Sequence, residues 1–165
     1  MYCCGDPAPK TVSAEAFSQI GRNMKEYTFV KMWAGPPKAD GIYDVDDSIT
    51  GVIRTDGPVI TFNGAWAQNI NKPEMFIDFL GDKAGIRLQY GGNFTVYGTK
   101  DGKLWQETPE YASVNMFQNE IDAFLRCVRG GEKLPSHIDV NIKTSKIMQA
   151  LYDSSAAHRE IVFED

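Results

Sequence analysis

The sequence predicts an α+β protein: an open-faced, predominantly antiparallel β-sheet with two or more helices packed on one face. Two observations support this class. From residue 47 to residue 107, hydrophobic residues alternate with a period of two, and glycine-containing turns separate the segments. After residue 115 the hydrophobic period becomes helical. A run of strands followed by helices is typical of an α+β layer, and we expect residues 1–165 to form one domain.

Three consecutive hairpins make up the predicted sheet. Asp56-Gly57 and Asp101-Gly102 are turn signals for the first and the third hairpin. Residues 12–17 form either another strand or a short helix, and residues 161–163 predict a short final strand. The hairpins pair residues 47–53 with 59–67, 75–80 with 86–90, and 94–97 with 103–107.

The first hairpin has two different faces. One carries large hydrophobic residues such as Ile53 and Phe62 and should meet the helices. The other is mixed rather than strongly polar, so it is available to pack on another subunit or domain. We therefore expect a homo-oligomer formed through this open sheet face. Its residues include Thr50, Val52, Val59, Thr61 and Ala65.

Two helices follow the strands. The first is predicted over residues 115–129, where Asn115 and Gln118 resemble a capping box and Gly130-Gly131 ends the helix. The second opens near Ser136 and ends near His158. Short turns are expected elsewhere: Gly5 should end a helical turn, and Gly91-Gly92 should form a turn or bulge between strands.

Composition excludes several function classes. Hydrophobic residues make up 42% of the chain and the net charge is −5, so neither disorder nor polyanion binding is expected. No stretch approaches the roughly 18 apolar residues of a membrane-spanning helix. There are only three cysteines, a small and odd number that does not predict a disulfide framework. Reduced cysteines are typical of cytoplasmic proteins, so we expect this location.

The sequence offers no catalytic, cofactor-binding or metal-binding set. His137 and His158 are expected to be structural residues at helix ends. The carboxylates of Asp44, Asp46 and Asp47 are expected at the solvated start of a strand, with a role at an interface or pocket as the alternative. The dinucleotide fingerprint Gly-x-Gly-x-x-Gly is absent. Four aromatic residues are assigned to the core rather than to base stacking: Phe62, Trp66, Phe76 and Phe79.

Residues 66–72 form the most suggestive local segment. A strand ends in the aromatic Trp66 and is followed by amide side chains and Lys72. Amides both donate and accept hydrogen bonds, so such a rim suits a hydroxyl-rich ligand. An ordinary polar loop remains the alternative.

Taken in order, these motifs resemble the C-terminal domain of the Gfo/Idh/MocA oxidoreductases, the relatives of glucose–fructose oxidoreductase and inositol dehydrogenase. The resemblance covers residues 2–163. It is carried by the first hairpin (residues 45–67), the turn at 79–85, the helix around 120–131 and the final helix at 147–154.

The resemblance implies a parent enzyme with two domains. An N-terminal Rossmann domain would bind NAD or NADP and carry a Glu-Lys-Pro lysine, and a His-x-x-Asp segment would follow; neither motif occurs in this sequence. We therefore expect a fragment that begins downstream of the catalytic histidine and is catalytically inactive alone. The parent would be an NAD(P)-dependent dehydrogenase of a sugar or polyol hydroxyl, and the fragment would hold no cofactor.

In such enzymes the C-terminal sheet forms one wall of the substrate pocket. The resemblance places this wall at the loop after Trp66, with Asn69 and Lys72, and at the segment beginning with Tyr111. These four residues are the predicted substrate-binding residues. Two alternatives remain: a non-enzymatic ligand-binding or scaffold module, and a subunit that pairs with a separate Rossmann chain.

Overall fold

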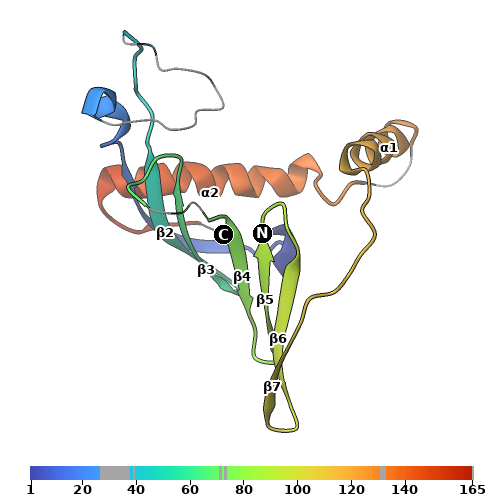
Figure 1. Cartoon of the computed structure of the whole chain (residues 1–165). Coiled ribbons are helices and arrows are strands. Elements are labelled where there is room, and N and C mark those ends of the chain that lie inside the picture. The colour runs from blue at the N-terminus through green and yellow to red at the C-terminus, as the bar shows by residue number, and fades with distance from the viewer. Residues whose placement is uncertain (27–37, 39, 71, 73, 131–132, 165) are drawn as a thin grey trace. The chain divides into compact units, whose positions relative to one another are not determined.

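The described part of the chain folds into two antiparallel sheets and two α-helices, with two short 3-10 helices near the N-terminus. The computed structural model describes residues 1–26, 38, 40–70, 72, 74–130 and 133–164. These fall into two compact units, residues 1–69 with 126–165, and residues 70–125. The predicted α+β class is confirmed, but the strands expected in one sheet are divided between two four-stranded sheets, as Figure 1 shows.

The first unit contains a sheet with the strand order β3-β2-β1-β8. Strands β2 and β3 form the predicted first hairpin, and residues 12–17 belong to a strand rather than a helix. Strand β8 pairs with β1 only at Thr11 and Val12, so along most of that edge of β1 the described residues provide no neighbouring strand. The bounds are β1 Pro9–Phe17, β2 Ser48–Thr55, β3 Val59–Ala65 and β8 Ile161–Val162.

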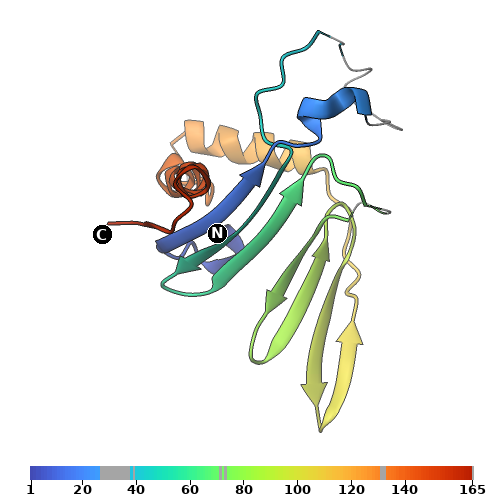
Figure 2. The same ribbon diagram turned by 90° about the vertical axis from the view of Figure 1, so that its left-hand side faces the viewer.

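Helix α2 (Ile138–Ala157) covers one face of this sheet and closes its core. Figure 2 looks almost along the helix axis, with β1 beside it. The register pairs Val12 with Ile53, and Ile53 with Ile60, so these side chains share the face that meets Ile147 of the helix. The face predicted to be hydrophobic is therefore the one that is buried.

The ends of α2 confirm the structural roles predicted for the two histidines. At its start, His137 Nδ1 accepts a hydrogen bond of 3.3 Å from the backbone N–H of Asp139. At its end, His158 has a left-handed backbone conformation with φ of 48°, and its Nδ1 lies 3.1 Å from the carboxylate of Glu15.

Side chains from α2 also complete the hydrogen bonding of β1. Beyond the short pairing with β8, the backbone N–H of Ala14 donates to Ser154 Oγ at 3.0 Å, and that of Ala16 donates to Ser155 Oγ at 2.9 Å. Ser154 is only 1% exposed, and its hydroxyl donates in turn to the carbonyl of Arg159 at 2.7 Å. The helix thus takes the place of a neighbouring strand at this edge.

The second unit contains a sheet with the order β4-β5-β6-β7, joined by tight turns. The predicted Asp101-Gly102 turn is confirmed: both residues have positive φ, 52° and 72°, as a two-residue hairpin turn requires. The bounds are β4 Phe76–Leu80, β5 Ala84–Gln89, β6 Phe94–Lys100 and β7 Lys103–Glu107.

One face of this second sheet carries most of its hydrophobic side chains, and we call it the apolar face. Charged residues lie only along its β6–β7 side, where Glu107 is opposite Val96 and Lys103 is opposite Lys100. The register places its members side by side on four strands. No described residue of this unit, including these, is fully buried. The members are Ile77, Phe79, Ile86, Leu88, Phe94, Val96 and Trp105.

The opposite face of the second sheet is more polar. Arg87 donates to both carboxylate oxygens of Asp78, at 2.7 and 2.6 Å, and its guanidinium lies 4.3 Å from the centre of the Phe76 ring. The expectation that Phe76 belongs to a core is therefore wrong, because this ring is exposed and supports a surface ion pair.

Helix α1 (Met116–Val128) begins as predicted, since the backbone N–H of Gln118 donates to Asn115 Oδ1 at 3.1 Å. Its hydrophobic side chains, including Phe117 and Phe124, are exposed rather than packed on a sheet. Within the described residues, neither helix is long and apolar enough to span a membrane.

Candidate functional site

Trp66, the first predicted site residue, lies just after β3 and is 51% exposed. Its backbone N–H donates to the carbonyl of Asp47 at 3.1 Å, and its indole N–H donates to the carbonyl of Asp46 at 3.0 Å. Phe62 packs against the core as predicted, but Trp66 does not. The assignment of Trp66 to the core is wrong, because its side chain is half exposed and does not belong to the cluster of residues packed around Ile147.

Tyr43 packs against Trp66, a contact that was not predicted from the sequence. The two ring centres are 5.6 Å apart, with the planes inclined by 48°. The Tyr43 ring also fills the space beside Gly21, where a Cβ atom would lie 1.9 Å from Tyr43 Cζ. No periodic pattern links residues 21, 43 and 66, so only the isolated glycine after Ile20 could have hinted at this packing.

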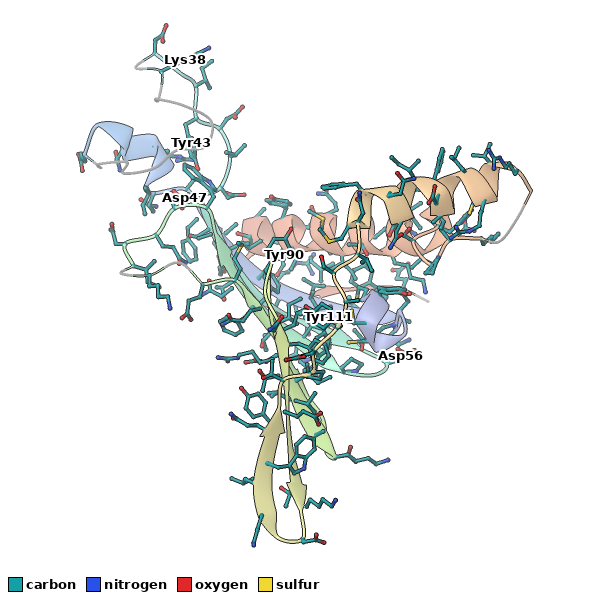
Figure 3. All side chains as sticks on the ribbon, turned by 45° about the vertical axis from the view of Figure 1, so that its right-hand side comes forward. Lys38, Tyr43, Asp47, Asp56, Tyr90 and Tyr111 are labelled. Atoms are coloured by element: carbon teal, nitrogen blue, oxygen red, sulfur yellow. The ribbon has the colours of Figure 1, made fainter. Side chains whose placement is uncertain are left out.

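Asp47 lies beside this aromatic pair and is only 3% exposed. Its Oδ2 accepts hydrogen bonds from the backbone N–H groups of Ile20 at 2.7 Å and Gly21 at 3.0 Å. Figure 3 shows Asp47 and Tyr43 together at the start of β2. The expectation that the Asp47 carboxylate is solvated is therefore wrong. It is buried, and it holds the turn at Ile20 and Gly21, which is distant in sequence.

The hydroxyl group of Tyr43 has an unusual environment. It is buried, and no hydrogen-bond partner for it is found among the described residues. Burial raises the pKa of Tyr43 above its ordinary value, and the carboxylates of Asp47 and Asp46 act in the same direction, while the Trp66 indole opposes them. The phenol is thus a neutral group at physiological pH.

The other three predicted site residues are exposed, and they do not all belong to the same unit. Asn69 belongs to the first unit with Trp66, whereas Lys72 and Tyr111 belong to the second. The Tyr111 ring stacks on Phe94 with centres 6.1 Å apart, and its hydroxyl donates to the carbonyl of Gly92 at 3.3 Å. Lys72 lies 4.0 Å from the carboxylate of Glu74.

The second unit also has a shallow surface hollow of about 700 Å³ at one end of its sheet. Glycines 81, 85 and 98 contribute to its lining, together with Tyr97 and Trp105. None of the four predicted site residues lines this hollow, and its charged lining residues are Asp82 and Lys83. Its size alone does not make it the better candidate.

The described residues do not fit a dinucleotide. The glycine pair 91–92 forms a turn between strands, with φ of 73° at Gly91, and does not open a helix. The first turns of both helices are occupied by their own side chains, Asn115 in α1 and His137 in α2. In the described part of the chain, no glycine-rich loop leads into a helix to hold a pyrophosphate.

Comparison with known proteins agrees with the resemblance seen in the sequence. No known protein-family model matches the chain. Over 157 residues, or 94% of its length, the chain is 29% identical to D-glucoside 3-dehydrogenase of Escherichia coli (strain K12), and the match covers 42% of that protein.

Solved structures show the same fold. A levoglucosan dehydrogenase, in complex with NADH and levoglucosan, superposes with a TM-score of 0.69 at 16% identity, over 96% of this chain and 45% of the other. The aldose–aldose oxidoreductase of Caulobacter crescentus, complexed with glycerol, gives 0.66 at 15% identity, over 95% and 42%. The chain has the fold of a Gfo/Idh/MocA C-terminal domain.

The chain spans less than half the length of each of these relatives. Within it, the Trp66 and Tyr43 pair is the best-defined group of candidate ligand-binding side chains, because backbone hydrogen bonds fix both the indole and the turn behind it. The assignment of Trp66, Asn69, Lys72 and Tyr111 to substrate binding stays a prediction.

Proposed function

We propose that this chain is the substrate-binding and oligomer-forming domain of a cytoplasmic, NAD- or NADP-dependent dehydrogenase that acts on a hydroxyl of a sugar or polyol. The observation that carries this proposal is the alignment of 94% of the chain with a D-glucoside 3-dehydrogenase. A glycoside related to glucose is accordingly the first substrate class to test.

In this proposal the cofactor domain and the present chain have different tasks. The nicotinamide, bound by another domain, would accept or supply the hydride. The residues of this chain bind and orient the sugar through the Trp66 indole and the side chains of Asn69, Lys72 and Tyr111. The isolated chain is therefore inactive.

Calorimetry of the 165-residue chain with NADH tests the cofactor part of the proposal. We expect no binding at micromolar concentrations, and micromolar affinity would contradict the proposal. The genomic sequence upstream of the Met1 codon is the complementary test. An in-frame segment of about 120–200 residues with Gly-x-Gly-x-x-Gly and Glu-Lys-Pro supports the dehydrogenase. Without such a segment in this gene or a partner gene, the dehydrogenase proposal fails.

The oligomer is assigned to the apolar face of the second sheet. The open face of the first hairpin, around Val52 and Thr61, mixes threonine with valine, whereas the apolar face presents aliphatic and aromatic side chains on four neighbouring strands. An antiparallel sheet needs at least one covered face for stability, and an exposed apolar patch of this kind typically marks an interface. A second copy of the chain satisfies both requirements.

Two lysine substitutions on opposite faces test this interface. Ile86→Lys places a charge on the apolar face and should convert the oligomer to monomer in analytical ultracentrifugation. Leu104→Lys changes an equally hydrophobic, exposed residue on the other face and should leave the oligomer intact. A wild-type chain that is monomeric at high concentration would refute the assignment.

A further inference from the structure

The Trp66 indole is fixed in place yet open to a ligand. Its only donor, the indole N–H, is already used by the carbonyl of Asp46. About half of the residue remains exposed, and the indole ring has no polar atom other than this N–H. The chemistry left for Trp66 is therefore stacking on its ring face rather than hydrogen bonding.

The orientation of the indole is set by the layer behind it. The Tyr43 ring contacts Trp66 and lies directly on the backbone of Gly21, where no side chain could be accommodated. That backbone is in turn held by the two hydrogen bonds to Asp47 Oδ2. Asp47, Gly21 and Tyr43 thus form a continuous support that ends at the indole.

The Tyr43 ring, and not its hydroxyl, makes the contacts of this support. The hydroxyl is buried, and no hydrogen-bond partner for it is found among the described residues. A phenylalanine at this position would keep the ring contacts. Because the ring is what touches both Gly21 and Trp66, we attribute the positioning of Trp66 to the Tyr43 ring.

We propose that Trp66 is a stacking face for a pyranose ring, and that Tyr43, Gly21 and Asp47 are its positioning residues. This inference rests on the function proposed above and narrows its ligand from sugar or polyol to a cyclic sugar. The C–H groups of a pyranose form a rigid surface that matches the electron-rich face of an indole. An acyclic polyol has no such surface and loses conformational freedom when it is flattened against a ring.

Saturation-transfer NMR on the 165-residue chain tests the proposal with methyl β-D-glucopyranoside and sorbitol as the two probes. Transfer to the glucoside should be strongest for C–H protons of one ring face, and sorbitol should show little. Trp66→Ala should weaken glucoside binding about five- to tenfold, the scale of one aromatic contact. Trp66→Phe should lose less of this affinity for the glucoside. Trp105→Phe is the matched control and should leave the affinity for the glucoside unchanged.

The positioning residues need a readout of their own. In a chain with Trp33 and Trp105 replaced by Phe, the emission of Trp66 should shift in Gly21→Ala, which displaces the Tyr43 ring. Glucoside affinity should fall in the same variant. Tyr43→Phe keeps the ring and should preserve both signals, so it separates positioning by the ring from any direct role of the hydroxyl.

Two results would overturn the inference. If the glucoside binds but Trp66→Ala binds it equally well, or if sorbitol binds as strongly, Trp66 is no pyranose-stacking face, while the proposed function stands. If the glucoside shows no transfer at all, both the inference and the sugar-binding part of the proposed function fail.

Discussion

Replacing Ser154 with alanine removes a hydroxyl that joins helix α2 to the edge of β1. In the folded chain this hydroxyl accepts from Ala14 N–H at 3.0 Å and donates to the Arg159 carbonyl at 2.7 Å, and the side chain is almost completely buried. Without it, both backbone groups lose this partner, the Ala14 N–H in a buried position and the Arg159 carbonyl in a partly buried one. The variant tests whether the helix truly substitutes for a missing strand.

The size of the effect follows from the number of bonds lost. Each hydrogen bond contributes about 0.5–1.5 kcal/mol, and a buried group left unpaired raises the cost of its loss. Alanine regains about 0.5 kcal/mol through its better helix propensity. We therefore expect Ser154→Ala to lower the free energy of unfolding by about 2 kcal/mol. Ser155→Ala loses one partly buried bond, to Ala16, and should cost about 0.5 kcal/mol.

Urea denaturation followed by circular dichroism at 222 nm measures both variants, because α2 is the longer of the two helices. Ser155→Ala is the matched control, since it has the same chemistry one residue along the helix. Equal destabilisation by the two substitutions would show that burial and the second bond of Ser154 add nothing. That result would refute the idea that this hydroxyl completes the sheet edge.

Three further predictions concern single side chains. Gly102→Ala should destabilise the second sheet by about 1 kcal/mol because φ is 72° there, whereas Gly64→Ala, with open space around it, should be neutral in the same urea titration. The ion pair with Arg87 holds the pKa of Asp78 below its usual range, so its contribution is present at neutral pH and is lost as the pH falls through the lowered pKa. The urea midpoint of Asp78→Asn should thus fall less than that of wild type between pH 6 and pH 2; equal falls would contradict this. Asp47→Asn should lower the free energy of unfolding by about 1 kcal/mol, because it weakens the hydrogen bonds to the Ile20–Gly21 turn. Asp46→Asn is its control and should have a smaller effect, because these hydrogen bonds are made by Asp47.

Local patterns in the sequence were enough to predict most of the elements. Period-two alternation gave the hairpin of β2 and β3 with the correct buried face, because the register puts Ile53 and Ile60 opposite each other. The Asp-Gly signal gave the turn between β6 and β7, since few other dipeptides accept two positive φ angles. Helical spacing and the Asn115 cap gave α1 to within a residue at each end.

Long-range arrangement could not be predicted in the same way. Alternation shows that a segment is a strand but does not show which sheet it joins, and nothing in residues 66–75 marks the break between β3 and β4. The burial of Asp47 was missed for a similar reason. Its partners are backbone amides 26 and 27 residues away, and backbone groups leave no trace in a side-chain pattern.

The two units differ in how they are stabilised, and this difference bears on the site. The first has a core of its own, formed by residues such as Val12 and Ile147, so the support of Trp66 needs no partner. The second has an open apolar face, and Tyr111 stacks on Phe94, a member of that face. Burial of the face by a second copy would also immobilise the Tyr111 ring. It follows that Trp66 is supported within the first unit alone, whereas the oligomer proposed above would bury the surface on which Tyr111 stacks.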